Sequence, residues 1–169
     1  MPNNLVTFSP EQNQKVADFL QELNQGFNLY KQAVAKPFPD LPDLQKATEA
    51  TMRQSLLDQR AYLMGMKSSL EIIEATLEHH LKIWYEGRKP LSVLRDWTRL
   101  AIRIFENSIE ENLLWEKPNP MGYSEANRRK SIFSENRRLG EDSNQKLING
   151  AAGVYELTGV NILDWVSSD

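Results

Sequence analysis

The two histidines of the chain, His79 and His80, lie side by side among several glutamates, a composition that invites a metal-site interpretation. Helical di-iron proteins place a histidine three residues after a glutamate, so that both side chains share one helical face. Here the positions three residues after Glu74 and Glu78 are both leucines. Adjacent helical residues also point about 100° apart, so the two imidazoles cannot easily chelate one ion. The spacing predicts no metal site.

Other residue types offer no recognisable catalytic arrangement. The 169-residue chain has no cysteine, which excludes disulfides, thiolate zinc sites and a cysteine nucleophile. No serine lies in a nucleophile-elbow context, and the glycines of residues 149–153 lack the preceding strand and the lysine of a phosphate-binding loop. We therefore expect a protein that is not an enzyme and that carries no cofactor.

His80 has a second interpretation, because it falls on an apolar stripe of a predicted helix. Gln59 occupies an equivalent position three heptads earlier. Polar residues in such a stripe fix register or oligomeric state, or they are simply accommodated at the edge of a bundle. A polar pocket near these two residues would instead suit a helical-bundle enzyme or ligand-binding protein, which stays open as an alternative.

Basic side chains are concentrated in one part of the chain. Residues 121–139 carry five basic and two acidic side chains, whereas residues 140–169 carry one basic and five acidic ones. Such a cluster can steer an acidic protein partner or contact nucleic-acid phosphates. The net charge of −3 and the lack of aromatic nucleic-acid motifs favour the protein partner. The cluster consists of Arg128, Arg129, Lys130, Arg137 and Arg138.

The elements that carry these residues are predicted to be helices. A capping serine, Ser9, followed by Pro10 and by Gln12 at the third helical position, marks the start of a helix over 9–35. Apolar residues then recur in steps of three and four, which gives this helix one apolar face. Three prolines between residues 37 and 42 forbid its continuation.

A second helical pattern covers 43–87, and its apolar residues recur with a heptad period. A straight helix of about 42 residues spans about 63 Å, whereas a compact globule of this size is about 40 Å across. The helix must either break near residues 65–69 or protrude and bury its seam against another chain. We expect the second outcome, a homodimer. The seam residues are Leu63, Met66, Leu70, Ile73, Leu77, His80 and Trp84.

The rest of the chain predicts a third helix, shorter helices and a C-terminal segment. A third helix covers 92–116, and shorter helices cover 124–157, the first of them basic and closed by Gly140. The segment 158–169 is too apolar for a solvated tail and too short to fold alone. We expect it to dock through Trp165 into a groove, either of its own bundle or of another chain.

Together these patterns predict a single all-α domain over 1–169, an antiparallel helical bundle with one long central helix, a shorter basic helix and an apolar C-terminal segment. The corresponding function is a non-catalytic protein–protein interaction module, such as an adaptor, an assembly factor or a small subunit of a complex. A small subunit of a nucleoprotein complex is the first alternative. We expect a cytoplasmic location and no membrane association, because no long apolar run and no leader pattern are evident.

Overall fold

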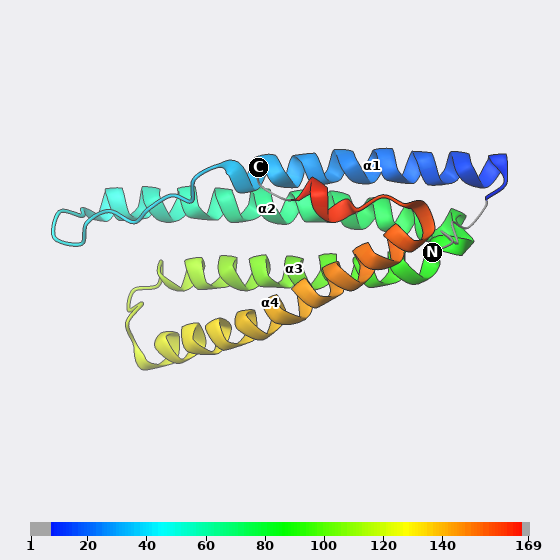
Figure 1. The fold of residues 1–169 in the computed structure, drawn as a ribbon. Helices are drawn as coiled ribbons and strands as arrows, with labels where there is room; N and C mark the ends of the chain where they lie inside the picture. Colours follow the sequence, from blue (N-terminus) through cyan, green and yellow to red (C-terminus); the bar gives the residue numbers. More distant parts are fainter. Residues whose placement is uncertain (1–7, 167–169) are drawn as a thin grey trace.

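The computed structural model describes residues 8–166, and all its regular elements in that range are helices (Figure 1). Four α-helices pack side by side, which confirms the predicted all-α bundle. Two short 3₁₀ helices complete the order of elements. The elements are α1 (Pro10–Ala35), α2 (Glu49–Ile83), η1 (Tyr85–Gly87), α3 (Arg88–Leu114), α4 (Tyr123–Thr158) and η2 (Ile162–Trp165).

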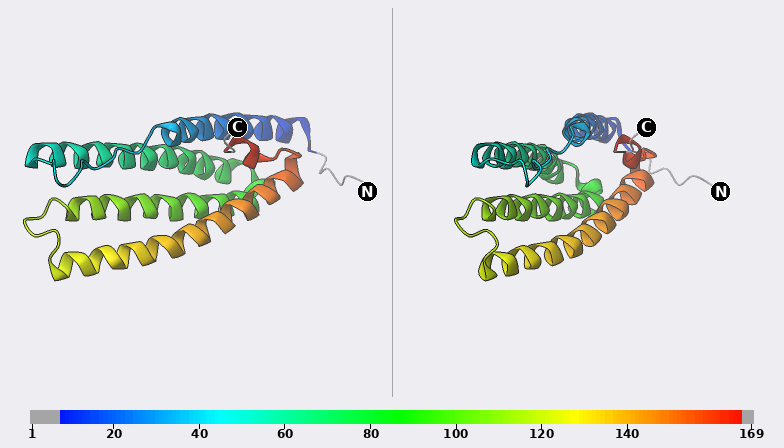
Figure 2. Two further views of the ribbon diagram at one scale, coloured as in Figure 1. Left: turned by 60° about the vertical axis from the view of Figure 1, so that its left-hand side comes forward. Right: turned by 90° about the vertical axis from the view of Figure 1, so that its left-hand side faces the viewer.

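Each α-helix packs against the next one along the chain, so α2 lies between α1 and α3, and α4 packs on α3 (Figures 1 and 2). The first and last helices do not pack extensively against each other, and η2 contacts both of them. The bundle is therefore elongated and has an incompletely closed side between α1 and α4.

Capping groups set the start of the first two helices. The Ser9 hydroxyl accepts a hydrogen bond from the Gln12 backbone N–H at 3.2 Å, and the Gln12 side chain accepts one from the Ser9 N–H, as predicted. The same reciprocal arrangement joins Thr48 and Thr51. The second helix therefore begins at Glu49 rather than at residue 43, and it ends at Ile83.

The long helix α2 is continuous for 35 residues and does not break at residues 65–69. Its length is matched by its neighbours, since α3 has 27 residues and α4 has 36. The expectation of an overhanging helix assumed a nearly spherical domain. That assumption is wrong here, because several long helices lie alongside one another.

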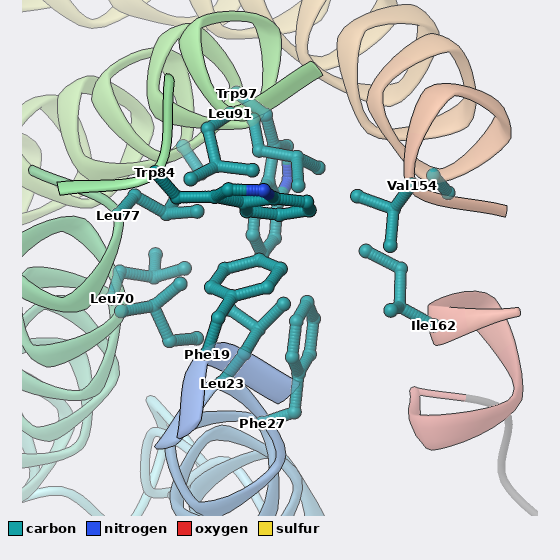
Figure 3. Packing of buried hydrophobic residues seen from close by; sticks show 14 of the residues in the cluster. Phe19, Leu23, Phe27, Leu70, Leu77, Trp84, Leu91, Trp97, Val154 and Ile162 are labelled. Carbon is teal, nitrogen blue, oxygen red and sulfur yellow. The ribbon is translucent and has the colours of Figure 1, made fainter. Parts of the chain in front are cut away.

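The seam of α2 is buried inside its own chain, which corrects the expectation that it faces a second copy. Leu70, Leu77 and Trp84 of the seam pack in one cluster with apolar side chains of α1 and α3 (Figure 3). A second chain could reach them only if the bundle opened. The buried seam residues are Leu63, Met66, Leu70, Ile73, Leu77, His80 and Trp84.

The second half of the chain also differs from its predicted boundaries. The third helix begins at Arg88 rather than at residue 92, because η1 leads directly into α3, where Pro90 lies in the first turn. Gly140 does not end a helix, since α4 is one continuous element. A helical glycine is disfavoured by about 1 kcal/mol relative to alanine, and burial of residues such as Ile132 and Val154 offsets that penalty.

Two glycines allow α3 and α4 to approach closely. A Cβ atom added to Gly150 would lie 2.6 Å from the side chain of Leu94, and one added to Gly153 would lie 2.7 Å from Pro90. Both distances are far below a van der Waals contact. The glycines of residues 149–153 thus serve helix packing rather than phosphate binding.

The C-terminal segment docks on its own bundle, which is one of the two predicted alternatives. Ile162 is fully buried and belongs to the main core cluster, near Val154 of α4 (Figure 3). The ring of Trp165 meets Phe27 of α1 edge-on, with 6.0 Å between ring centroids. Residues 167–169 of the predicted docking segment lie outside the described residues.

The continuity of α2 gives a first prediction. Gly65→Ala should raise the free energy of unfolding by about 0.5–1 kcal/mol, because alanine favours the helix and the added methyl meets open space. Gly26→Ala is the matched control and should be destabilising, since its Cβ would lie 2.9 Å from Ile73. Urea denaturation of both variants measures the difference. A destabilising Gly65→Ala would contradict a continuous helix at this position.

Candidate interaction groove

An open groove of about 840 Å³ lies where α1 and α4 fail to meet. The end of α1 forms one wall, the middle of α4 forms the other, and α3 forms the floor. The floor is built from Trp97, Ala101, Ile104 and Phe105 of α3. The groove therefore presents an aromatic and aliphatic surface framed by two helices.

The α1 wall combines apolar side chains with one phenol. Tyr30 and Val34 lie one helical turn apart and both line the groove. Burial raises the pKa of Tyr30 above its ordinary value, and the nearby Tyr62 phenol adds to the shift. Tyr30 therefore keeps its proton at neutral pH and offers a neutral hydroxyl next to an apolar floor.

The charged residues that line the groove lie on its walls. Lys31 comes from α1, and Arg137 and Glu141 come from α4. Arg137 and Glu141 are mostly exposed, and their closest charged atoms are 3.9 Å apart. The floor from α3 contributes no charge. This arrangement suits the binding of an apolar surface.

One end of the groove is defined by the chain's own C-terminal segment. Val166, the residue that caps η2, lines the groove. Just before it, η2 contacts both α1 and α4. One stretch of the gap between these helices is thus filled by a short apolar element, and the neighbouring stretch is open.

His80 is placed in the core, away from this groove. Its ring packs edge-on against Phe19, with 5.3 Å between centroids, and its Nε2 lies 2.9 Å from a carboxylate oxygen of Glu22. Its Nδ1 is buried and has no hydrogen-bond partner among the described residues. The ring therefore acts as part of the α1–α2 packing.

Gln59 does not share a site with His80. The two residues are separated by about 30 Å along α2, and the Gln59 side chain donates a hydrogen bond to the Pro39 carbonyl at 2.8 Å. Gln59 thus ties the connection between α1 and α2 to the helix. A common polar pocket for the two residues is excluded by this separation. Within residues 8–166, no group of three histidine, aspartate or glutamate side chains is arranged to hold a metal ion.

The basic cluster on α4 is partly used within the chain. Arg128 donates two hydrogen bonds to Glu110 of α3, at 2.5 and 3.0 Å. Arg129 donates to the Pro120 carbonyl, and its guanidinium lies 4.2 Å from the ring centroid of Trp115. These two arginines hold α4 and the preceding loop against α3. The remaining members, Lys130, Arg137 and Arg138, are exposed.

The Arg128–Glu110 pair predicts a specific pH dependence. The hydrogen bond from Arg128 lowers the pKa of Glu110, so the pair stabilises the fold at neutral pH. That contribution is present above the unfolded glutamate pKa of about 4.3 and is lost as the pH falls through the lower folded value. Glu110→Gln should therefore be slightly less stable than the natural protein at pH 7, with a difference that shrinks in acid.

Thermal unfolding of both proteins from neutral to acidic pH measures this difference. The pair lies at the surface, so we expect a small effect that is also weaker at high salt. Glu125→Gln, which breaks the surface pair of Lys117 and Glu125 (3.9 Å apart), is the control for the loss of a surface ion pair. A stability difference that grows in acid would contradict the assigned pairing.

Few of the site residues predicted from the sequence lie at the groove. Arg137 lines it, and Trp165 directly precedes Val166, which lines it, whereas the seam residues of α2 are in the core. The groove-lining residues that sequence reasoning missed include Asn136, Gly140 and Leu147. The seven-residue step from Gly140 to Leu147 could have indicated a shared helical face. No local pattern reveals that α1 and α4 are held apart.

Comparison with family models, curated proteins and solved structures finds no match to this chain. Across residues 8–166, no helix is both long enough and apolar enough to cross a membrane. The groove and the surfaces beside it therefore provide the physical basis for inferring a function.

Proposed function

We propose that this protein is a non-catalytic interaction module that binds an amphipathic helix of another protein in the groove between α1 and α4. The observation that carries the proposal is the gap between these helices. The η2 segment fills one stretch of this gap, and the neighbouring stretch is open. Helix-in-groove recognition needs an apolar floor and two flanking walls. The residues of α3 and the facing sides of α1 and α4 supply them.

The chain's own η2 indicates what kind of segment suits this gap. Its apolar Ile162 points into the core, whereas Asp164 is exposed to solvent. A partner helix that continues along the same gap would place apolar residues on Ile104 and Phe105 in the same way. Aromatic floor residues are typical anchors of such interfaces.

Charge on the walls favours an acidic partner helix. Lys31 and Arg137 stand on opposite walls, and Glu141 offsets part of their positive charge. Acidic residues at the edges of a bound helix would lie near the two cations, which accelerates association and sets orientation more than it raises affinity. We therefore propose an amphipathic helix with acidic flanks as the partner, in the cytoplasm.

The nucleic-acid alternative has less support. Phosphate binding requires cations that are free to contact the backbone, and Arg128 and Arg129 are already engaged with Glu110, the Pro120 carbonyl and Trp115. The homodimer expected through α2 is no longer part of the proposal, because the seam is buried.

A designed peptide can test the proposal before the natural partner is identified. The probe is a fluorescent helical peptide with leucines on one face and glutamates at its edges, and fluorescence anisotropy reports binding. We expect Ile104→Glu in the floor to weaken binding by at least about tenfold, since it places a charge in an apolar contact. Ile72→Glu, at an exposed position on α2, should leave binding unchanged.

Two further measurements protect this test against misfolding and nonspecific adsorption. Val34→Glu on the exposed α1 wall should also weaken binding, and its exposure makes a folding defect less of a concern. A peptide with lysines in place of glutamates should bind more weakly than the acidic one. Equal binding to the natural protein, Ile104→Glu and Val34→Glu would refute the groove as the site.

A further inference from the structure

The outer face of α4 carries large apolar side chains that are exposed to solvent. Phe133 is 73% exposed, and Ile148 is 44% exposed. They are fifteen residues apart in sequence, four turns of an α-helix plus about 60°, so both lie on the same side of the helix. Exposed apolar residues aligned on one helix face are typical of an interaction surface.

Charged residues near the middle of the same helix form an inverted pattern. Arg137 and Arg138 come before Leu139 and Gly140, and Glu141 and Asp142 follow them. When the helix is read from its C-terminal end, the acidic pair comes first and the basic pair second. Each basic position then corresponds to an acidic position of the helix read in the usual direction. An antiparallel second copy of this helix would therefore bring opposite charges together on both sides of a two-fold axis.

Three midpoints fall within one residue of each other near the centre of α4. The helix runs from Tyr123 to Thr158, and its midpoint falls between Gly140 and Glu141. The midpoint between Phe133 and Ile148 falls at the same place. The charge pattern inverts one residue earlier, between Leu139 and Gly140. A single two-fold axis can thus satisfy full helix overlap, apolar contact and charge pairing.

Pairing within one helix does not account for this pattern well. An acidic residue four positions before a basic one is the favourable order on a helix, whereas here each arginine precedes its acid. The closest contact between Arg137 and Glu141 is 3.9 Å, and both side chains are more than 70% exposed. These side chains therefore remain accessible for ion pairs with another chain.

The shape of α4 is compatible with such a contact. The helix lies at one side of the bundle and curves with its convex side away from the other helices (Figure 2). Two convex helices approach most closely at their middles, where the four charges lie. Phe133 and Ile148, two turns on either side, are then the nearest apolar residues.

We propose that the outer face of α4 binds a second copy of this chain, as an antiparallel and two-fold symmetric pair. Arg137 of one copy faces Glu141 of the other, and Arg138 faces Asp142. Phe133 of one copy packs near Ile148 of the other. This surface is distinct from the α2 seam and includes Arg137 and Glu141 at the α4 wall of the groove, so the bundle need not open for two copies to associate.

Light scattering coupled to size exclusion, over a concentration series at low and high salt, tests this pairing. We expect a dimer of the natural protein that weakens as salt screens the charges. The double variant R137E/R138E should associate at least about tenfold more weakly, because like charges then face each other across the axis. The double variant E141R/D142R should behave in the same way.

Mixing the two double variants is the most decisive experiment. In a mixed dimer, carboxylates of one chain face arginine side chains of the other in both halves of the contact. The mixture should form a dimer at concentrations at which either variant alone is monomeric. R88E/K89E, at an exposed basic pair on another surface, should dimerise like the natural protein. F133S should weaken the dimer while far-UV circular dichroism reports an intact fold.

Several results would overturn the pairing. These are a natural protein that stays monomeric at every concentration, a dimer that survives both charge reversals, and a mixture that fails to associate. Ile104→Glu, which impairs the groove, should leave self-association unchanged. Failure of groove binding and failure of α4 pairing are therefore distinguishable.

Discussion

Replacing Trp84 with alanine should lower the free energy of unfolding by about 3–5 kcal/mol, the range for removal of a large aromatic side chain from a core. Trp84 is fully buried at the end of α2, and its ring lies 5.5 Å from that of Phe19. The backbone at Gly87 approaches the ring so closely that an added Cβ would lie 2.2 Å from it. The cavity left behind cannot close without moving η1.

Two comparisons make this result specific. Trp115→Ala removes the same side chain from a partly exposed position, so its effect on unfolding in urea should be much smaller. Trp84→Phe should lose less than Trp84→Ala, because Nε1 of Trp84 has no hydrogen-bond partner within residues 8–166 to forfeit. If Trp84 instead faced a second chain, its replacement would change association and leave the stability of the monomer nearly intact.

Ile162→Ala should lower the free energy of unfolding by about 2–5 kcal/mol, a large effect for a residue so near the end of the chain. Ile162 is fully buried and joins η2 to the core formed by all four α-helices. Loss of its side chain should release the segment together with the contact between Trp165 and Phe27.

Backbone amide exchange can separate release of the segment from general destabilisation. Relative to the natural protein, Ile162→Ala should speed up amide exchange more strongly in residues 159–166 than in α2 and α3. Ile72→Ala, at an exposed position, should change neither stability nor exchange beyond a few tenths of a kcal/mol. An Ile162→Ala protein as stable as Ile72→Ala would contradict docking of this segment in the core.

Much of the fold follows from local rules that the sequence displays. The capping box at Ser9 and Gln12 predicts the start of α1 correctly, and the prolines after residue 36 predict its end. The heptad pattern of α2 identifies residues that are indeed buried together. These features depend on neighbours within a few residues, so a single sequence contains enough information to find them.

The errors concern partners that are distant in the sequence. A seam such as that of Leu70 and Leu77 requires an apolar partner, but its own pattern does not say whether α1 and α3 or another chain provides one. Gly140 has the local signature of a helix end, and packing of α4 on α3 overrides it. The groove itself exists because α1 and α4 stay apart, which no stretch of sequence encodes locally.

Hydrogen–deuterium exchange of the full chain, with and without the acidic amphipathic peptide, can show whether the groove binds partners while the α2 seam holds the core. We expect added protection in residues 30–35, 97–105 and 136–147, which line the groove. Amides along the α2 seam should be slow to exchange before the peptide is added and should change little. Protection that appears along α2, with none at the groove, would contradict this division of roles.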